Sequence, residues 1–251
     1  MIRRYGLVLG AVLATLLASL GTDTLPAQQL DATSVIQRID ASVKARLDNI
    51  AGYTDIENYA VYRNNDEVHP VAEMKVKTDY EKTTGKNYTI LSQSGSAIIR
   101  NLVLGAILDN EKKLNLPDNR EGAWITSSNY EMKLEGNGIQ HVAGKDCLVL
   151  DLIPKRKTPY LIEGTLWVDA KDYSIVQIRG TSSRSASIFS GRTQMMRQYA
   201  LISGFAQATH ARAVSNTSLF GKTIITIDYH DYQVRLAPGQ KASTSQPVSN
   251  Q

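Results

Sequence analysis

The stretch Glu73-Met74-Lys75-Val76-Lys77-Thr78-Asp79-Tyr80 has the clearest secondary-structure pattern in this sequence of 251 residues. Met74, Val76 and Tyr80 fall on one side of an extended chain, and charged side chains fall on the other. Side chains of a β-strand point alternately to opposite faces, so this period of two predicts a strand with one buried and one solvated face. Burial on one face only is typical of an antiparallel sheet.

Similar strand patterns recur on both sides of this stretch. They cover residues 53–63, 86–92, 130–134, 140–142, 148–153, 165–169, 174–178, 195–202, 206–215 and 222–234. The clearest pair is the hairpin of 165–169 and 174–178, which turns at Ala170-Lys171-Asp172. Residues 179–192 are rich in Ser and Gly, which predicts a loop. The pattern as a whole predicts one antiparallel sheet of about ten strands, and a sheet of that length tends to curl.

An amphipathic helix is predicted before the first strand, capped by Asp31 or Thr33 and ended by Gly52. Apolar residues recur there at spacings of three and four, namely Val35, Ile36, Ile39, Val43, Leu47 and Ile50. The polar side carries as many acids as bases, so this helix is expected to cover a sheet and not to lie on a membrane.

A second helix is predicted after the third strand, with Ser94 or Ser96 as its cap and Pro117 beyond its end. Its apolar residues at helical spacing are Ile98, Ile99, Leu102, Val103, Ala106 and Ile107. A helix this apolar must pack into something, and it is expected to act as a lid over the concave face. The predicted fold class is therefore α+β: a long curved antiparallel sheet, or half-open β-barrel of about ten strands, covered by helices.

The first residues have the features of a secretory signal. Arg3 and Arg4 precede an apolar run over 7–20, and Ala27 offers a small residue before a cleavage point. We expect a signal peptide over 1–27 and a periplasmic mature protein; an uncleaved membrane anchor is the alternative. The rest divides into one domain over 28–236 and a disordered polar tail over 237–251.

Charge and cysteine content limit the function classes. Loss of Arg3, Arg4 and Asp23 with the signal peptide lowers the formal net charge from +4 to +3. This mild balance does not suggest a nucleic-acid partner, which requires clustered basic residues. The single cysteine, Cys147, lies in an apolar run and is expected to be a buried, inert thiol. It is far from the cleavage point, so no N-terminal lipidation is expected.

Catalytic and metal-binding motifs are not found in the sequence. The four histidines, His69, His141, His210 and His230, are far apart and belong to no metal-ligand pattern. There is no Gly-x-Ser-x-Gly nucleophile motif. Gly221-Lys222-Thr223 mimics the end of a phosphate-binding loop, but Asn216 stands where the first Gly should be.

Carboxylates offer one weak enzymatic alternative. A glycosidase needs two of them flanking the scissile bond, and the candidates are Asp55, Glu57, Glu73 and Asp79. Acids are common on the wet faces of strands, so we predict a non-enzymatic protein with no catalytic residue, no metal and no cofactor.

Three local segments resemble a known family. They are Gly144-Lys145-Asp146-Cys147-Leu148-Val149-Leu150, Glu163-Gly164-Thr165-Leu166-Trp167-Val168-Asp169 and Ile175-Val176-Gln177-Ile178. With the order of elements over 31–234, they resemble the hairpin pattern of the LolA/LolB-like outer-membrane lipoprotein-sorting superfamily, departing from it at Cys147 and Gln177. The resemblance implies a carrier of acylated proteins or other lipids that uses no cofactor. Sensor-like members of the superfamily share the same fold.

The predicted function is thus a periplasmic carrier that binds lipid or the acyl chains of lipoproteins in a hydrophobic cavity, for sorting to the outer membrane. Its partners would be these acyl chains and proteins of the inner and outer membranes. The cavity residues predicted from the strand and helix patterns are Met74, Val76, Tyr80, Ile98, Leu102, Leu148, Leu150, Trp167, Ile225 and Ile227. Two alternatives stay open: the same residues form a filled core, or the chain is an envelope regulatory or assembly module that binds a protein partner.

Overall fold

The structure, a computed structural model, describes residues 31–136, 138–185, 192–217 and 221–239. Its strands are β1 (Ile50–Arg63), β2 (Ala72–Glu81), β3 (Gly85–Gly95), β4 (Tyr130–Leu134), β5 (Gln140–Val142), β6 (Lys145–Pro154), β7 (Ile162–Asp169), β8 (Ile175–Ser182), β9 (Gln194–Ile202), β10 (Phe205–Thr217) and β11 (Gly221–Leu236). Its helices are α1 (Ala32–Asn49), α2 (Ala97–Ile99), the π-helix η1 (Arg100–Gly105), α3 (Ala106–Leu114) and the 3₁₀-helix η2 (Arg120–Ala123).

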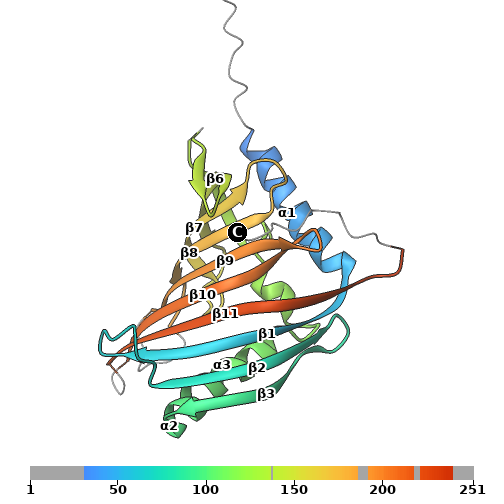
Figure 1. The fold of residues 1–251 in the computed structure, drawn as a ribbon. Coiled ribbons are helices and arrows are strands. Elements are labelled where there is room, and N and C mark those ends of the chain that lie inside the picture. The colour runs from blue at the N-terminus through green and yellow to red at the C-terminus, as the bar shows by residue number, and fades with distance from the viewer. Residues whose placement is uncertain (1–30, 137, 186–191, 218–220, 240–251) are drawn as a thin grey trace, which may run out of the picture.

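All the strands described belong to one sheet in the order β3-β2-β1-β11-β10-β9-β8-β7-β6-β4, with β5 also paired to β6. Every pairing is antiparallel. The sheet curves strongly but β3 and β4 do not pair, so the barrel is half open, with the helices on its concave side (Figure 1). This confirms the predicted fold class, with eleven strands in place of about ten.

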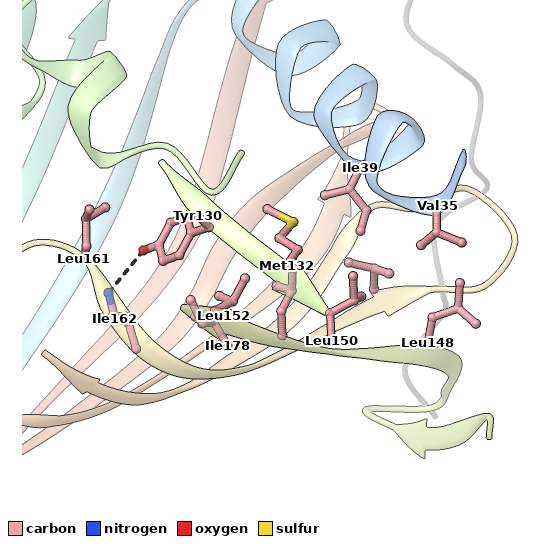
Figure 2. Close-up of a cluster of buried hydrophobic side chains, with 12 residues drawn as sticks. Val35, Ile39, Tyr130, Met132, Leu148, Leu150, Leu152, Leu161, Ile162 and Ile178 are labelled. Atoms are coloured by element: carbon pink, nitrogen blue, oxygen red, sulfur yellow. Dashed lines mark hydrogen bonds between the residues drawn. The ribbon is translucent and has the colours of Figure 1, made fainter. Parts of the chain in front are cut away.

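Helix α1 begins at its predicted cap. The Asp31 carboxylate accepts hydrogen bonds from the backbone N–H groups of Thr33 and Ser34, at 3.2 and 3.0 Å. Such a cap satisfies donors that the first turn leaves free. The N-terminal half of α1 buries Val35 and Ile39 against β4, β6 and β7, as Figure 2 shows. Its C-terminal half is only partly buried.

The second helical segment differs from its prediction. Ile98 and Leu102 are 65% and 61% exposed, whereas Ile99, Leu104 and Leu108 are buried against β1 and β2. The cause is the π-helix η1, because an i→i+5 turn adds a residue to the repeat. The buried residues are therefore spaced five and then four apart, and the apolar face assumed from a regular period of 3.6 was wrong at Ile98 and Leu102.

The loop predicted over 179–192 was also partly wrong, because β8 continues to Ser182. Gly164 and Gly180 face each other across β7 and β8, and a Cβ at Gly164 would lie 2.2 Å from the carbonyl oxygen of Arg179. The glycine that suggested a loop is thus required by close contact between strands. Residues 186–191 lie outside the described part.

The ends of the chain are described only in part. The predicted signal peptide over 1–27 lies outside the described residues, and so does the predicted tail from residue 240 onward. Before that point, the backbone N–H of Ala237 donates to the carbonyl of Asn49 at 2.7 Å. Among the helices described, none is both long and apolar enough to span a membrane.

Candidate functional site

A cavity of about 900 Å³ lies on the concave side of the sheet. The C-terminal half of α1 and part of α3 border it, and strands β8 to β11 form its floor. Two apolar clusters occupy the two ends of the concave face, one under α1 and one under η1 and α3. The cavity lies in the region between them, which neither helix covers fully.

Small side chains on β10 help to keep this space open. Ala206, Ala208, Ala211 and Ala213 all line the cavity. A β-bulge between Ala208 and His210 changes their spacing from two to three, so the alanines on both sides of it reach the same cavity. A strand of larger apolar residues here would fill the space that alanine leaves. The alanines that recur over 206–213 are the sequence signal for this floor, and the predicted lining did not include them.

The remaining apolar lining comes from several elements. Val43 and Leu47 from α1 face β9 and β11, which contribute Met195, Ile225 and Ile227. Tyr53, Tyr80 and Tyr232 form one aromatic corner of the cavity. The ring centroid of Tyr53 lies 4.9 Å from that of Tyr80 and 5.7 Å from that of Tyr232.

The ten residues predicted to line a cavity are divided by the structure. Tyr80, Ile225 and Ile227 border the cavity. Met74 and Val76 share a face with Tyr80 but are buried under η1.

The other five predicted residues also lie away from the cavity. Leu148 and Leu150 are buried under the N-terminal half of α1. Ile98 and Leu102 are exposed. Trp167 alternates with the buried Leu166 and Val168, and its Nε1 donates to Gln140 Oε1 at 2.9 Å.

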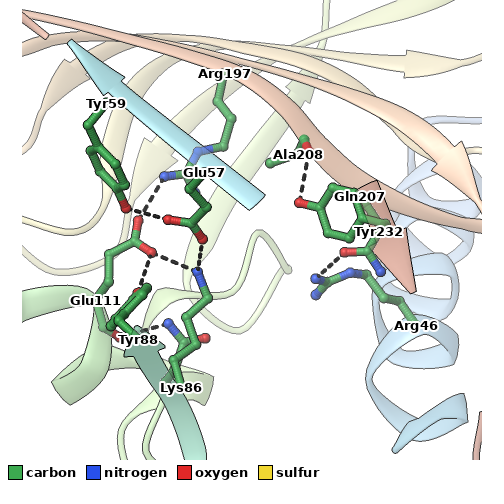
Figure 3. A network of polar contacts seen from close by, with 11 residues as sticks. Arg46, Glu57, Tyr59, Lys86, Tyr88, Glu111, Arg197, Gln207, Ala208 and Tyr232 are labelled. Carbon is green, nitrogen blue, oxygen red and sulfur yellow. Dashed lines mark hydrogen bonds and ion pairs between the residues drawn. The ribbon is translucent and has the colours of Figure 1, made fainter. Parts of the chain in front are cut away.

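A buried charge network joins α3 to the sheet (Figure 3). The Lys86 ammonium lies 3.2 Å from Glu57 Oε1 and 2.8 Å from Glu111 Oε2. Tyr59 donates its hydroxyl proton to Glu57, and Tyr88 donates to Glu111 at 3.2 Å. Each charge in this network therefore has a partner, which is the condition for charges to be tolerated in a protein interior.

The pKa values in this network follow from that pairing. Burial acts to raise the pKa of Glu111, but the charges of Lys86 and Arg197 outweigh it and lower the pKa to about 2. Burial acts to lower the pKa of Lys86, and the carboxylates, Glu111 above all, hold it well above its ordinary value. Both groups are thus charged at neutral pH.

Asp55 is the exception among the buried acids. It is 2% exposed, and although the hydroxyls of Tyr232 and Thr78 lie near it and act to lower its pKa, neither carboxylate oxygen makes a hydrogen bond of good geometry in the described part of the chain. Burial, and then the negative charge of Glu57, raise its pKa to about 6, while Lys86 offsets part of that rise. Asp55 and Glu57 face inward, whereas Glu73 and Asp79 are exposed on β2, so the four acids considered for a glycosidase do not form one site.

The remaining candidates for chemistry have ordinary surroundings. Cys147 is buried, as predicted, and burial raises the pKa of its thiol. His141 and His230 lie beside Asp146 and Asp231, with ring nitrogens 3.1 and 2.9 Å from the carboxylates. Within the described ranges, no group of three or more His, Cys, Asp or Glu residues is placed to hold a metal ion.

Comparison with known proteins gives structural matches only. No protein-family model matches the chain, and no curated protein sequence matches it. Solved structures similar to it include a domain described as an outer membrane lipoprotein-sorting protein from Vibrio parahaemolyticus, with 13% identity and a TM-score of 0.46 over 84% of this chain and 95% of that chain. A LolA superfamily protein from Nitrosomonas europaea has 13% identity and a TM-score of 0.40 over 86% of this chain and 98% of that chain.

A third similar structure is a DUF1329 family protein from Desulfovibrio piger, with 15% identity and a TM-score of 0.40 over 82% of this chain and 95% of that chain. LolA superfamily and lipoprotein-sorting proteins are thus among the solved structures similar to this chain.

Proposed function

We propose that the protein is a periplasmic carrier that holds lipid or the acyl chains of lipoproteins in its cavity, for sorting to the outer membrane. The observation that carries the proposal is the open space of about 900 Å³ on the concave face, with apolar side chains on its walls and alanines on its floor. This volume is within the range of about 300–1,000 Å³ typical of sites for small ligands.

Apolar burial alone can supply the affinity for such a ligand. Removing an acyl chain from water is worth about 0.8 kcal/mol per CH₂, so a chain of about fifteen CH₂ groups is worth roughly 12 kcal/mol before the costs of binding. Those costs range from about 4 to about 15 kcal/mol, and at the lower end of that range they leave a useful affinity without any catalytic group. The proposed activity therefore needs no cofactor and no reaction.

The proposed ligand contacts are the cavity-lining residues. From the sequence-based set they keep Tyr80, Ile225 and Ile227, and the structure adds Val43 and Leu47 on α1. The alanines of β10 would lie beneath the acyl chain. The other seven residues of the sequence-based set are proposed to hold the fold together or to face solvent, and not to touch ligand.

A second candidate is a regulatory or assembly module that binds a protein partner. One observation favours it: large apolar side chains are exposed on β3, at an edge of the sheet, and on the helical segment that follows it. Ile90, Leu91, Ile98 and Leu102 are 51%, 49%, 65% and 61% exposed. Exposed apolar groups together with a free strand edge are features of partner-binding surfaces. Partner proteins in the inner or outer membrane would meet a carrier at the same place.

The test is native mass spectrometry of protein purified without detergent, together with extraction and identification of its lipids. We expect copurified lipid, or uptake of one lipid molecule per chain on titration. Replacing Ala213→Phe fills the cavity and should lower uptake at least tenfold. The matched control is Ala200→Phe, because Ala200 is exposed on the neighbouring strand β9 and does not border the cavity.

The same measurement separates the two candidates. If the folded wild-type protein takes up no lipid, the carrier proposal is wrong, and the exposed surface of β3 and η1 becomes the functional site. If Ala200→Phe lowers uptake as much as Ala213→Phe, lipid binds elsewhere than in this cavity.

A further inference from the structure

Arg46 is a cavity-lining cation that makes no ion pair among the described residues. It projects from the C-terminal half of α1, and its Nη2 donates to Gln207 Oε1 at 2.9 Å (Figure 3). Lys86, a buried cation that also lines the cavity, contacts two carboxylates. Arg46 therefore differs from Lys86 in carrying a charge that the described part of the protein does not balance locally.

Hydrogen-bond donors next to Arg46 are also unfilled. Arg46 Nε and Gln207 Nε2 are both buried, and neither has a hydrogen-bond partner in the described residues. Gln207 is only 1% exposed and lines the cavity, so bulk water does not readily satisfy its amide. Buried polar groups are nearly always paired, and both of these atoms are donors. The group that would complete the site is therefore an acceptor.

Arg120 adds a second cation of the same kind at the aromatic corner. Its Nη1 donates to the backbone carbonyl of Lys82 at 2.6 Å and to Tyr80 Oη at 3.3 Å. Its Nε is buried without a partner, and it too makes no ion pair among the described residues. Tyr80 stacks on Tyr53, and Arg46 is close enough to Tyr53 that, after Lys86, its charge opposes the rise that burial causes in the pKa of Tyr53. The two arginines thus approach one tyrosine pair.

Arginine is suited to the acceptor that this arrangement lacks. Its planar guanidinium presents parallel N–H donors that match a carboxylate or a phosphate in a bidentate way. A hydroxyl or a neutral ester would fill one donor but would leave the positive charges unbalanced. An oxyanion fills the donors and balances the charge, and it would be held beside an apolar channel.

We propose that Arg46 and Gln207, assisted by Arg120, bind the anionic headgroup of an amphiphile whose apolar chain lies over the alanines of β10. The ligand class is a single- or multi-chain lipid that ends in phosphate or carboxylate, such as a phospholipid or a fatty acid. This rests on the proposed function, since the apolar chain occupies the same cavity. It sharpens that function, because the acylated cysteine of a lipoprotein has no anionic headgroup to fill the site.

The experiment compares three probes that share one chain and differ in headgroup: dodecyl phosphate, dodecanoate and dodecanol. Calorimetric titration of the purified protein is expected to show at least tenfold tighter binding of one or both anions than of dodecanol. The two anions distinguish the phosphate source from the carboxylate source. The double variant Arg46→Met/Gln207→Met removes both partners of the 2.9 Å hydrogen bond, so neither is left unpaired. It should lose the anion preference and keep its affinity for dodecanol.

Two further variants test whether the anion preference depends on the Arg46 guanidinium. Arg46→Lys keeps the charge but loses the parallel N–H donors of the guanidinium, so it should keep only part of the preference for the anionic probes. It is also the variant to measure if the double variant does not fold. Arg179→Met is the matched control, because Arg179 is exposed on β8 and does not border the cavity. It should leave the preference unchanged.

The outcomes distinguish a failure of the proposed headgroup site from a failure of the carrier proposal. Equal affinity of the wild-type protein for all three probes would overturn the headgroup site and leave the carrier proposal standing. Loss of the preference in Arg179→Met to the same degree would also overturn it, because general electrostatic attraction would then explain the preference. Binding of none of the probes, dodecanol included, would overturn the carrier proposal itself.

Discussion

The two helices that pack on the concave face, α1 and α3, are held to the sheet by different kinds of interaction. At the N-terminal half of α1, Val35 and Ile39 pack against uncharged side chains of the sheet that include Leu150 (Figure 2). Under α3, apolar residues are joined by the charges of Glu57, Lys86 and Glu111. Apolar packing does not titrate, whereas a buried charge network depends on the protonation of every member. The packing of α1 on the sheet should therefore not depend on pH, whereas the packing of α3 should depend on it.

The largest effect is expected from breaking the network with Lys86→Met. Among the described residues, this leaves Glu57 with no cation and Glu111 with only Arg197, whose Nη2 is 3.6 Å away. Removing one partner of a buried ion pair typically costs about 3–5 kcal/mol, so the free energy of unfolding in urea should fall by that amount. Lys112→Met, on the exposed side of α3, is the control and should change it by less than about 0.5 kcal/mol. A loss for Lys86→Met as small as that of the control would mean that α3 is held by its apolar face alone.

The α1 side is tested by Leu150→Ala. Leu150 is fully buried, and removing its side chain leaves a cavity, so the expected loss is about 2–5 kcal/mol. Because no titratable carboxylate or ammonium belongs to this cluster, the loss should be the same at pH 5 and pH 8. Ile153→Ala, at a half-exposed site on the same strand β6, should cost much less. If the loss of unfolding free energy in Leu150→Ala varied with pH, the packing of α1 and the packing of α3 would be coupled.

Asp55→Asn tests the pH response on the α3 side and should stabilise the protein. Burial raises the pKa of Asp55 to about 6, so the folded state holds this proton more tightly than the unfolded state. The penalty for ionising Asp55 is absent below about pH 4, grows as the pH rises to about 6, and is complete above that. At pH 8 the variant should gain up to roughly 3 kcal/mol, from a shift of about two pKa units. Urea unfolding at pH 4.5 and pH 8 measures it, and an equal gain at both values would contradict the assignment.

Glu111 should give the opposite pH response. Its pKa is lowered to about 2, so its ionised form stabilises the folded state above the ordinary glutamate value and loses that effect as the pH falls toward 2. Glu111→Gln should therefore destabilise the protein at pH 7 and make little difference near pH 2.

The smallest effect is expected from Tyr130→Phe, which removes a hydroxyl from the α1 side. Tyr130 is buried, and its hydroxyl accepts a hydrogen bond from the backbone N–H of Ile162 at 3.1 Å. Loss of this acceptor should cost about 1 kcal/mol in urea unfolding. Tyr62→Phe, at a half-exposed position on β1, is the control. A cost as large as that of Leu150→Ala would mean that this side also depends on polar contacts.

The sequence was sufficient for features that depend on local periodicity. The alternation over 73–80 became β2 with its predicted inward face, and the spacing of Val35 and Ile39 became the buried side of α1. It failed at Ile98 and Leu102 because a π-helix changes the repeat, and nothing in the local pattern marks that change.

The cavity was harder to predict because alternation says which side chains face inward but not which of them a helix then covers. Leu150 and Ile225 have similar patterns, yet α1 packs near one of them and leaves the other at the cavity. The alanines of β10 were the one local signal for empty space. Arg46 and Gln207 are 161 residues apart in sequence, so their contact could only be seen in the fold.

The unpaired edges of the sheet have a mechanical consequence. In a closed barrel, strand number and stagger fix the diameter, and widening it means breaking hydrogen bonds between strands. Here β3 and β4 end the sheet without meeting, so its curvature can change by small adjustments of twist in every strand while all the ladders stay intact. Such an open sheet should therefore be able to widen or narrow its concave face without losing hydrogen bonds between strands.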